Sequence, residues 1–286
     1  MKLKHYGIAL VPICFVVFLF RAMELILTID TNTGYFTTGA ILPLVFDGVL
    51  ILIAAFFCTV LFRKKEPKPV AVRLYRISLF DMIFGVAASV LLVAAALFNF
   101  FGAVAEGTLP SGAGLLLSAR LWQILFSVLA ATFLIFFVTY PRMSAKQNLW
   151  RVMSLSVTAY YLFMLLVSFQ DLDVVFSRAF GIYQITFYGF AAAAAINFSK
   201  ILARLFGRKV FIFFTCLATV IATLRLADGV LFLIPGNPYQ IPMNLISYLA
   251  DVCVTVLMLS QMHKILKPIR RKRPAPEAVP AAEERN

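Results

Sequence analysis

The chain is built from long apolar runs separated by short polar connections. Read in windows of about 19 residues, eight runs are apolar on every face and reach the roughly 20 residues that a helix needs to cross a bilayer. Membrane β-strands are excluded because such strands are about ten residues long and alternate in polarity, whereas these runs are longer and apolar on every face. We therefore predict an all-α polytopic membrane bundle of eight transmembrane helices arranged as four hairpins. The predicted spans are Gly7–Ile29, Ala40–Phe62, Ile77–Phe101, Leu115–Tyr140, Leu149–Phe169, Phe180–Leu202, Val210–Ile234 and Leu245–Lys264.

Lysine and arginine occupy every second connection between these runs. They precede the first run, lie between the second and third, fourth and fifth, and sixth and seventh, and follow the eighth, whereas the other connections contain only Arg178. Because cytoplasmic loops carry the excess of cations, we predict that both termini are cytoplasmic. Residues 1–267 form the predicted transmembrane domain. Residues 268–286 are basic and then rich in Pro, Ala and Glu, and we expect this tail to be disordered.

Composition agrees with a membrane protein and indicates which class of partner to expect. The chain is 62% hydrophobic and only 14% charged, and its formal net charge is +13. Soluble domains contain about 45–50% apolar and about 25% charged residues, so little of this chain is available for a soluble domain. The positive excess follows from topology, which leaves the lipid bilayer as the expected partner and gives no reason to expect nucleic acid.

Cysteine and histidine argue against a cofactor site. The four cysteines lie within the apolar runs without a C-x-x-C spacing, and the two histidines, His5 and His263, lie at cytoplasmic ends. No nucleotide-binding loop, G-x-S-x-G or H-E-x-x-H motif occurs. We therefore expect no cofactor, no metal site and no enzymatic activity.

Two pairs of neighbouring runs carry one pattern of charges inside the membrane. In each, a cation is followed by an anion three residues on and by a second anion twenty-six residues on. The two sets are Arg21, Glu24 and Asp47, and Arg225, Asp228 and Asp251. A weaker echo links Asp47, Gln123 and Gln184, because each is followed by two alanines seven and eight residues later. These matches predict four parallel hairpin repeats that enter from the cytoplasm.

The helical rise of about 1.5 Å per residue places these groups in the outward half of the membrane. Asp81 differs, because it lies at the cytoplasmic end of its span, where Arg76 is the expected partner. Charged groups inside a bilayer are costly and should face the bundle interior in pairs. A spacing of three residues puts Arg21 with Glu24, and Arg225 with Asp228, on one helix face. The candidate binding residues are Arg21, Glu24, Asp47, Arg120, Gln123, Gln184, Arg225, Asp228 and Asp251.

Small and aromatic residues add two structural expectations. Alanine clusters in the third, fourth and sixth spans offer surfaces where helices approach closely. Tyr183 lies near a predicted membrane interface, where an amphipathic ring anchors a helix.

The segment Ile29-Asp30-Thr31-Asn32-Thr33-Gly34-Tyr35-Phe36, following Arg21-x-x-Glu24, resembles a loop of uncharacterised multipass membrane proteins of Gram-positive bacteria. In those proteins an I-D-x-x-T-G-[YF]-F segment follows a first span with R-x-x-[QE]. The resemblance implies a bacterial plasma membrane and no particular activity.

Two functions fit this sequence. The leading hypothesis is binding or transport of a small polar or charged solute at the outward layer, with Arg21, Arg120 and Arg225 as anion contacts and the carboxylates as carriers of a cation or proton. The alternative is a non-transporting membrane sensor or assembly component, in which the charges only fix how the helices dock.

Overall fold

The computed structural model describes residues 5–28, 41–63, 77–107, 118–139, 147–170, 181–203, 205, 207–232 and 245–266. Within these ranges there are eight helices, each long and apolar enough to cross a membrane, and no strand. The all-α class and the eight predicted spans are therefore confirmed. The helices are α1 (His5–Thr28), α2 (Leu42–Phe62), α3 (Leu79–Ala105), α5 (Ala119–Thr139), α6 (Gln147–Gln170), α8 (Gly181–Leu202), α9 (Arg208–Phe232) and α10 (Leu245–Leu266).

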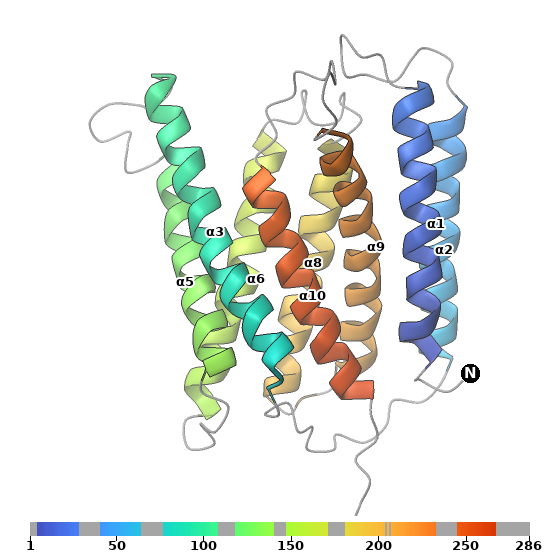
Figure 1. The fold of residues 1–286 in the computed structure, drawn as a ribbon. Helices are drawn as coiled ribbons and strands as arrows, with labels where there is room; N and C mark the ends of the chain where they lie inside the picture. Colours follow the sequence, from blue (N-terminus) through green and yellow to red (C-terminus); the bar gives the residue numbers. More distant parts are fainter. Residues whose placement is uncertain are drawn as a thin grey trace, which may run out of the picture.

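Several predictions fall on other parts of the chain. The loop at residues 29–36, the tail at residues 268–286 and Arg76 lie outside the described residues. Figure 1 shows that α1 begins and α10 ends at the same end of the bundle. The cytoplasmic location of that end, and the internal repeat, stay predictions.

Six of the helices form a closed ring of contacts. In the order α3, α5, α6, α8, α9, α10, each helix contacts the next, and α10 returns to α3. Helices α1 and α2, which the sequence predicts as the first hairpin, lie outside this ring, and both contact α9. Figure 1 shows α1 and α2 at one edge of the bundle, beside α9. The outer hairpin is thus attached to the ring mainly through one helix.

Burial follows this arrangement. In α9, 72% of the membrane-spanning window is buried, against 17% in α2. Large apolar side chains such as Leu44, Ile51 and Leu52 of α2 are exposed on the outside of the bundle. An exposed apolar belt is what lipid requires and water disfavours. The structure therefore supports an integral membrane protein.

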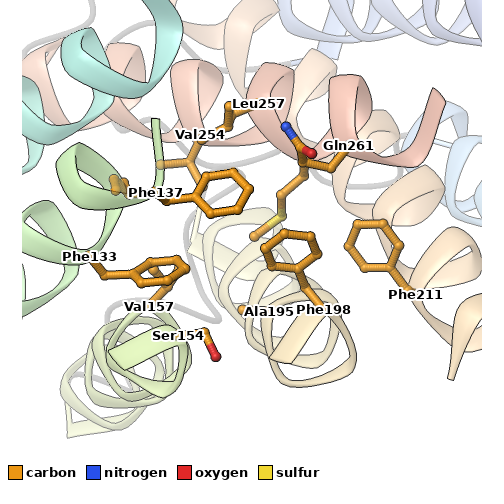
Figure 2. A pocket seen from close by; sticks show the side chains of 12 residues that line it. Phe133, Phe137, Ser154, Val157, Ala195, Phe198, Phe211, Val254, Leu257 and Gln261 are labelled. Atoms are coloured by element: carbon orange, nitrogen blue, oxygen red, sulfur yellow. The ribbon is translucent and has the colours of Figure 1, made fainter. Parts of the chain in front are cut away.

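The interior of the ring is packed with aromatic side chains. Figure 2 shows Phe133 and Phe137 of α5, Phe198 of α8 and Phe211 of α9 around a cavity of about 30 Å³. Its lining is mainly apolar, with Ser154 and Gln261 as the polar members.

Small residues let the ring helices approach closely, as predicted. Alanines of the three clusters are buried: Ala88, Ala95, Ala96, Ala130, Ala131, Ala191, Ala192, Ala194 and Ala195. The tightest contact involves Gly85 of α3, where an added Cβ would lie 2.4 Å from Cγ1 of Val138 on α5. Valine is stiff about χ1, so it cannot easily turn aside.

We predict that Gly85→Ala destabilises the protein by about 1–3 kcal/mol, because the extra methyl overpacks the α3–α5 contact. Thermal unfolding of the purified protein in detergent measures this. Gly102→Ala on the same helix is the matched control, since nothing lies within 4 Å of its added Cβ. The double variant Gly85→Ala, Val138→Ala should lose less than the sum of the single losses. Equal stability of the two glycine variants would contradict the proposed close packing.

Candidate functional site

Arg21 lies at the centre of a buried polar network toward the C-terminal end of α1. Its Nη1 donates a hydrogen bond to Oε2 of Glu24 at 2.7 Å, and its Nε donates to Oδ1 of Asp228 on α9 at 2.8 Å. The side chains of Arg21 and Glu24 are 0% exposed and that of Asp228 is 1% exposed. We call these three residues the Arg21 network. It joins α1 to α9 by charge-assisted hydrogen bonds, which are among the strongest available in proteins.

Tyr183 of α8 connects the Arg21 network to Asp47 of α2. The guanidinium carbon of Arg21 lies 4.6 Å from the centroid of the Tyr183 ring, within the range of a cation–π interaction. The Tyr183 hydroxyl donates a hydrogen bond to Oδ1 of Asp47 at 3.1 Å. Tyr183 is buried, so the prediction that it anchors α8 at a membrane interface is wrong. Its hydroxyl finds a carboxylate inside the protein, which satisfies the polar end of the ring.

Arg225 of α9 forms a second buried pair with Asp251 of α10. Its Nη1 donates to Oδ2 of Asp251 at 2.5 Å, and the hydroxyl of Tyr161 on α6 donates to Oδ1 of the same aspartate at 3.3 Å. We call Arg225 and Asp251 the Arg225 pair. Aromatic rings surround the guanidinium on α8 and α10, with centroids 4.9, 5.3 and 4.4 Å from its carbon, and belong to Phe187, Tyr188 and Tyr248. This pair therefore ties four helices of the ring together.

The pairing differs from the one that the sequence pattern suggests. Arg21 does bond Glu24 three residues on, but the described residues show no ion pair between Arg225 and Asp228. Asp228 bonds Arg21 instead. The reason is the position of α9, which lies between α1 and α10 and presents its two charged groups to different neighbours.

The charges in these two sites do not balance. Among the described residues, three buried carboxylates, of Glu24, Asp228 and Asp251, face two buried guanidiniums, of Arg21 and Arg225. In the described part of the chain, Oε1 of Glu24 and Oδ2 of Asp228 have no hydrogen-bond partner. Buried polar atoms are rarely left unpaired, so each such atom needs an explanation.

The other predicted residues lie apart from these sites. Arg120 is exposed at the start of α5. Gln123 is buried, and its Nε2 has no partner among the described residues. Gln184 is half-buried, and its Nε2 donates to the Tyr188 hydroxyl at 3.3 Å. Of the three, only Gln184 contacts a residue that surrounds the Arg225 pair.

A separate cluster at the opposite end of the bundle was missed as a site. Asp81 forms a capping box with Ser78 at the start of α3, and it also accepts hydrogen bonds from Ser260, Gln261 and Lys264 of α10. The partner expected for Asp81, Arg76, lies outside the described residues, and within them Lys264 forms an ion pair with Asp81. The Ser-x-x-Asp spacing ahead of an apolar run was an available signal for the cap.

The carboxylates do not form a metal centre. Among the described residues, no group of three or more His, Cys, Asp or Glu side chains is placed to hold a metal ion. The two free oxygens of Glu24 and Asp228 fall short of the six to eight ligands that Ca²⁺ takes and of the octahedral shell that Mg²⁺ demands. A proton needs only one of them.

No family model, curated protein or solved structure matches this chain. The function is therefore argued from the geometry of its own residues.

We predict that Asp251→Asn destabilises the protein by about 3–5 kcal/mol, because it leaves the buried Arg225 guanidinium without its counter-charge. Thermal unfolding in detergent measures the loss. The double variant Arg225→Met, Asp251→Leu should be markedly more stable than the single one, since neither charge then needs a partner. Arg120→Ala is the control, because Arg120 is exposed. Asp251→Asn unfolding at the temperature of the Arg120→Ala variant would disprove a tightly coupled pair.

Proposed function

We propose that this integral membrane protein binds a proton at the Arg21 network and uses that binding step to transport a small solute across a bacterial plasma membrane. The observation that carries the proposal is the surplus of one buried carboxylate, together with the two unpartnered oxygens of Glu24 and Asp228. The bacterial plasma membrane is inferred from the loop that follows α1, and the outward position from the distribution of cations.

An unneutralised carboxylate is expensive in this setting. Even on lenient insertion scales, placing an ionised aspartate at the centre of a membrane helix costs about 2.5–3.5 kcal/mol of free energy. Buried acids avoid this cost by pairing or by taking up a proton. Arg21 already pairs with both Glu24 and Asp228, so one proton on this pair of carboxylates makes the network neutral.

The same contacts argue against binding of an anion. The Arg21 guanidinium donates to two carboxylates, and the Arg225 guanidinium donates to Asp251 while aromatic rings surround it. An incoming anion would have to displace a carboxylate from its arginine, and that buried carboxylate would then lack a counter-charge. The network therefore favours a positively charged ligand, and a proton is the smallest one.

A non-transporting assembly or sensing role is the second candidate, and the Arg225 pair favours it. In this pair one cation faces one anion, and residues of α6, α8 and α10 contact it, so helix docking can explain its charges, although Nε of Arg225 has no hydrogen-bond partner among the described residues. The Arg21 network cannot be explained in the same way, because docking needs no surplus carboxylate. The Arg225 pair is thus consistent with a structural role alone, whereas the Arg21 network is the site that favours proton binding.

We predict that the wild-type protein shows the infrared carbonyl band of a protonated carboxylic acid, and that Glu24→Gln and Asp228→Asn each remove it. Either substitution deletes the surplus carboxylate, so the remaining charges balance without a proton. Both variants should fold, whereas Arg21→Gln should lose about 3–5 kcal/mol of stability because it strands two buried carboxylates. Isotope-edited infrared spectra in H₂O and D₂O make the assignment.

Asp47→Asn is the matched control, because Asp47 lies outside the Arg21 network and the band should survive its replacement. Proteoliposomes loaded with a pH-sensitive dye then test transport. The wild type should dissipate an imposed pH gradient faster in the presence of its solute, with the Glu24→Gln protein giving the background rate. A band that persists in both network variants, or a wild-type spectrum without one, would refute proton binding at this site.

A further inference from the structure

A groove on the lipid-facing side of the bundle lies beside Asp47 and does not belong to the Arg21 network. It has a volume of about 370 Å³ and is formed by α2, α8 and α9. This volume falls within the roughly 300–1,000 Å³ of small-molecule sites in proteins. Its wall includes the exposed side chains of Asp47, Ile51 and Ile182, so the groove opens sideways from the bundle.

The polarity of the groove changes along its length. Asp47 and Tyr183 lie near the ends of α2 and α8 that the charge distribution places outside. Farther along the same helices the wall is apolar and is formed by Ile53, Ala54 and Phe190. From Asp47 to Ala54 the helical rise gives about 10 Å. The groove therefore pairs one polar end near the surface with an apolar channel directed toward the membrane centre.

Charge decides which kind of molecule fits. Asp47 is the only Asp, Glu, Lys, Arg or His in the described lining, and the described residues give it no cationic partner. Its hydrogen bond comes from the hydroxyl of Tyr183, which carries no positive charge. An aspartate within a membrane span is costly unless it is paired, so a cation on the occupant would stabilise Asp47. A phosphate or carboxylate on the occupant would be repelled here.

We propose that the groove binds a cationic amphiphile, a molecule with one ammonium end and an apolar chain. The ammonium bonds the Asp47 carboxylate beside the Tyr183 hydroxyl, and the chain lies along α2 and α9 against Ala54 and Leu217. A zwitterionic phospholipid fits less well, because its phosphate lies between the ammonium and the chains, where the groove offers no cation. This site is separate from the proton proposed for Glu24 and Asp228, and each can fail without the other.

The test uses dodecylamine with a photoreactive diazirine in the middle of its chain, and the full-length protein in non-ionic detergent. After illumination, peptide mapping should locate the label on α2 or α9 within the groove. The corresponding dodecanol probe has the same chain without the charge and should label at least about tenfold less, as expected for loss of a charge-assisted hydrogen bond.

Two pairs of variants make the result specific. Asp47→Asn should reduce labelling by about tenfold or more, and Ala54→Trp should abolish it by filling the groove. Ala55→Trp is the matched control, because Ala55 is exposed on the same helix and does not line the groove. Thermal unfolding establishes that each variant is folded, and Ala54→Leu replaces Ala54→Trp if the latter is not. Equal labelling by the alcohol, unchanged labelling of Asp47→Asn, or displacement of the amine by phosphatidylethanolamine would overturn the proposal.

Discussion

The structure depends on how two guanidinium groups are neutralised inside a lipid-facing bundle. Neither Arg21 nor Arg225 can remain unpaired there. Arg21 bonds a carboxylate of its own helix and one of α9, and Arg225 bonds a carboxylate of the next helix, α10. Arg21 bonds Asp228 across 207 residues and so fastens α1 to the ring. Arg225 bonds Asp251 and joins α9 to α10. The contacts that make the fold specific are thus the same contacts that create the candidate site, which is the usual value of buried ion pairs in proteins.

Helix α9 takes part in both buried ion-pair sites, because it carries Arg225 and Asp228. It contacts α1, α2, α8 and α10, and it is the most buried of the membrane-spanning helices. Arg225 and Asp228 lie one turn apart on it but serve different neighbours. The aromatic residues of α8 lie against both sites, with Tyr183 beside Arg21 and Tyr188 beside Arg225. The two sites therefore share two adjoining helices, α8 and α9.

The sequence was sufficient for the spans because length and continuous apolarity decide whether a helix crosses a bilayer. It also identified Arg21, Glu24, Asp228, Arg225 and Asp251, since intramembrane charge is rare. It predicted the Arg21–Glu24 pair correctly, but the same spacing of three residues between Arg225 and Asp228 forms no ion pair among the described residues. Which pair forms depends on the order of helices in the ring, and local spacing does not contain that order. The partnership of Asp81 with Lys264, 183 residues away, was hidden for the same reason.

Among the described residues, more ion pairs join helices within the ring than join α1 or α2 to it. This difference determines which helices a bound proton would loosen. Helix α10 is fixed at both ends, by Asp251 near one end and by Lys264 with Asp81 near the other, and an aromatic core lies between them. The hairpin of α1 and α2 has no second ion pair of this kind among the described residues. A proton on Asp228 would neutralise one of the two described carboxylates that bond Arg21, while the Arg225 pair would be untouched. Under the proposed function, protonation would therefore loosen α1 against α9 and leave the ring closed, so the movable part of the molecule is the hairpin that borders the groove.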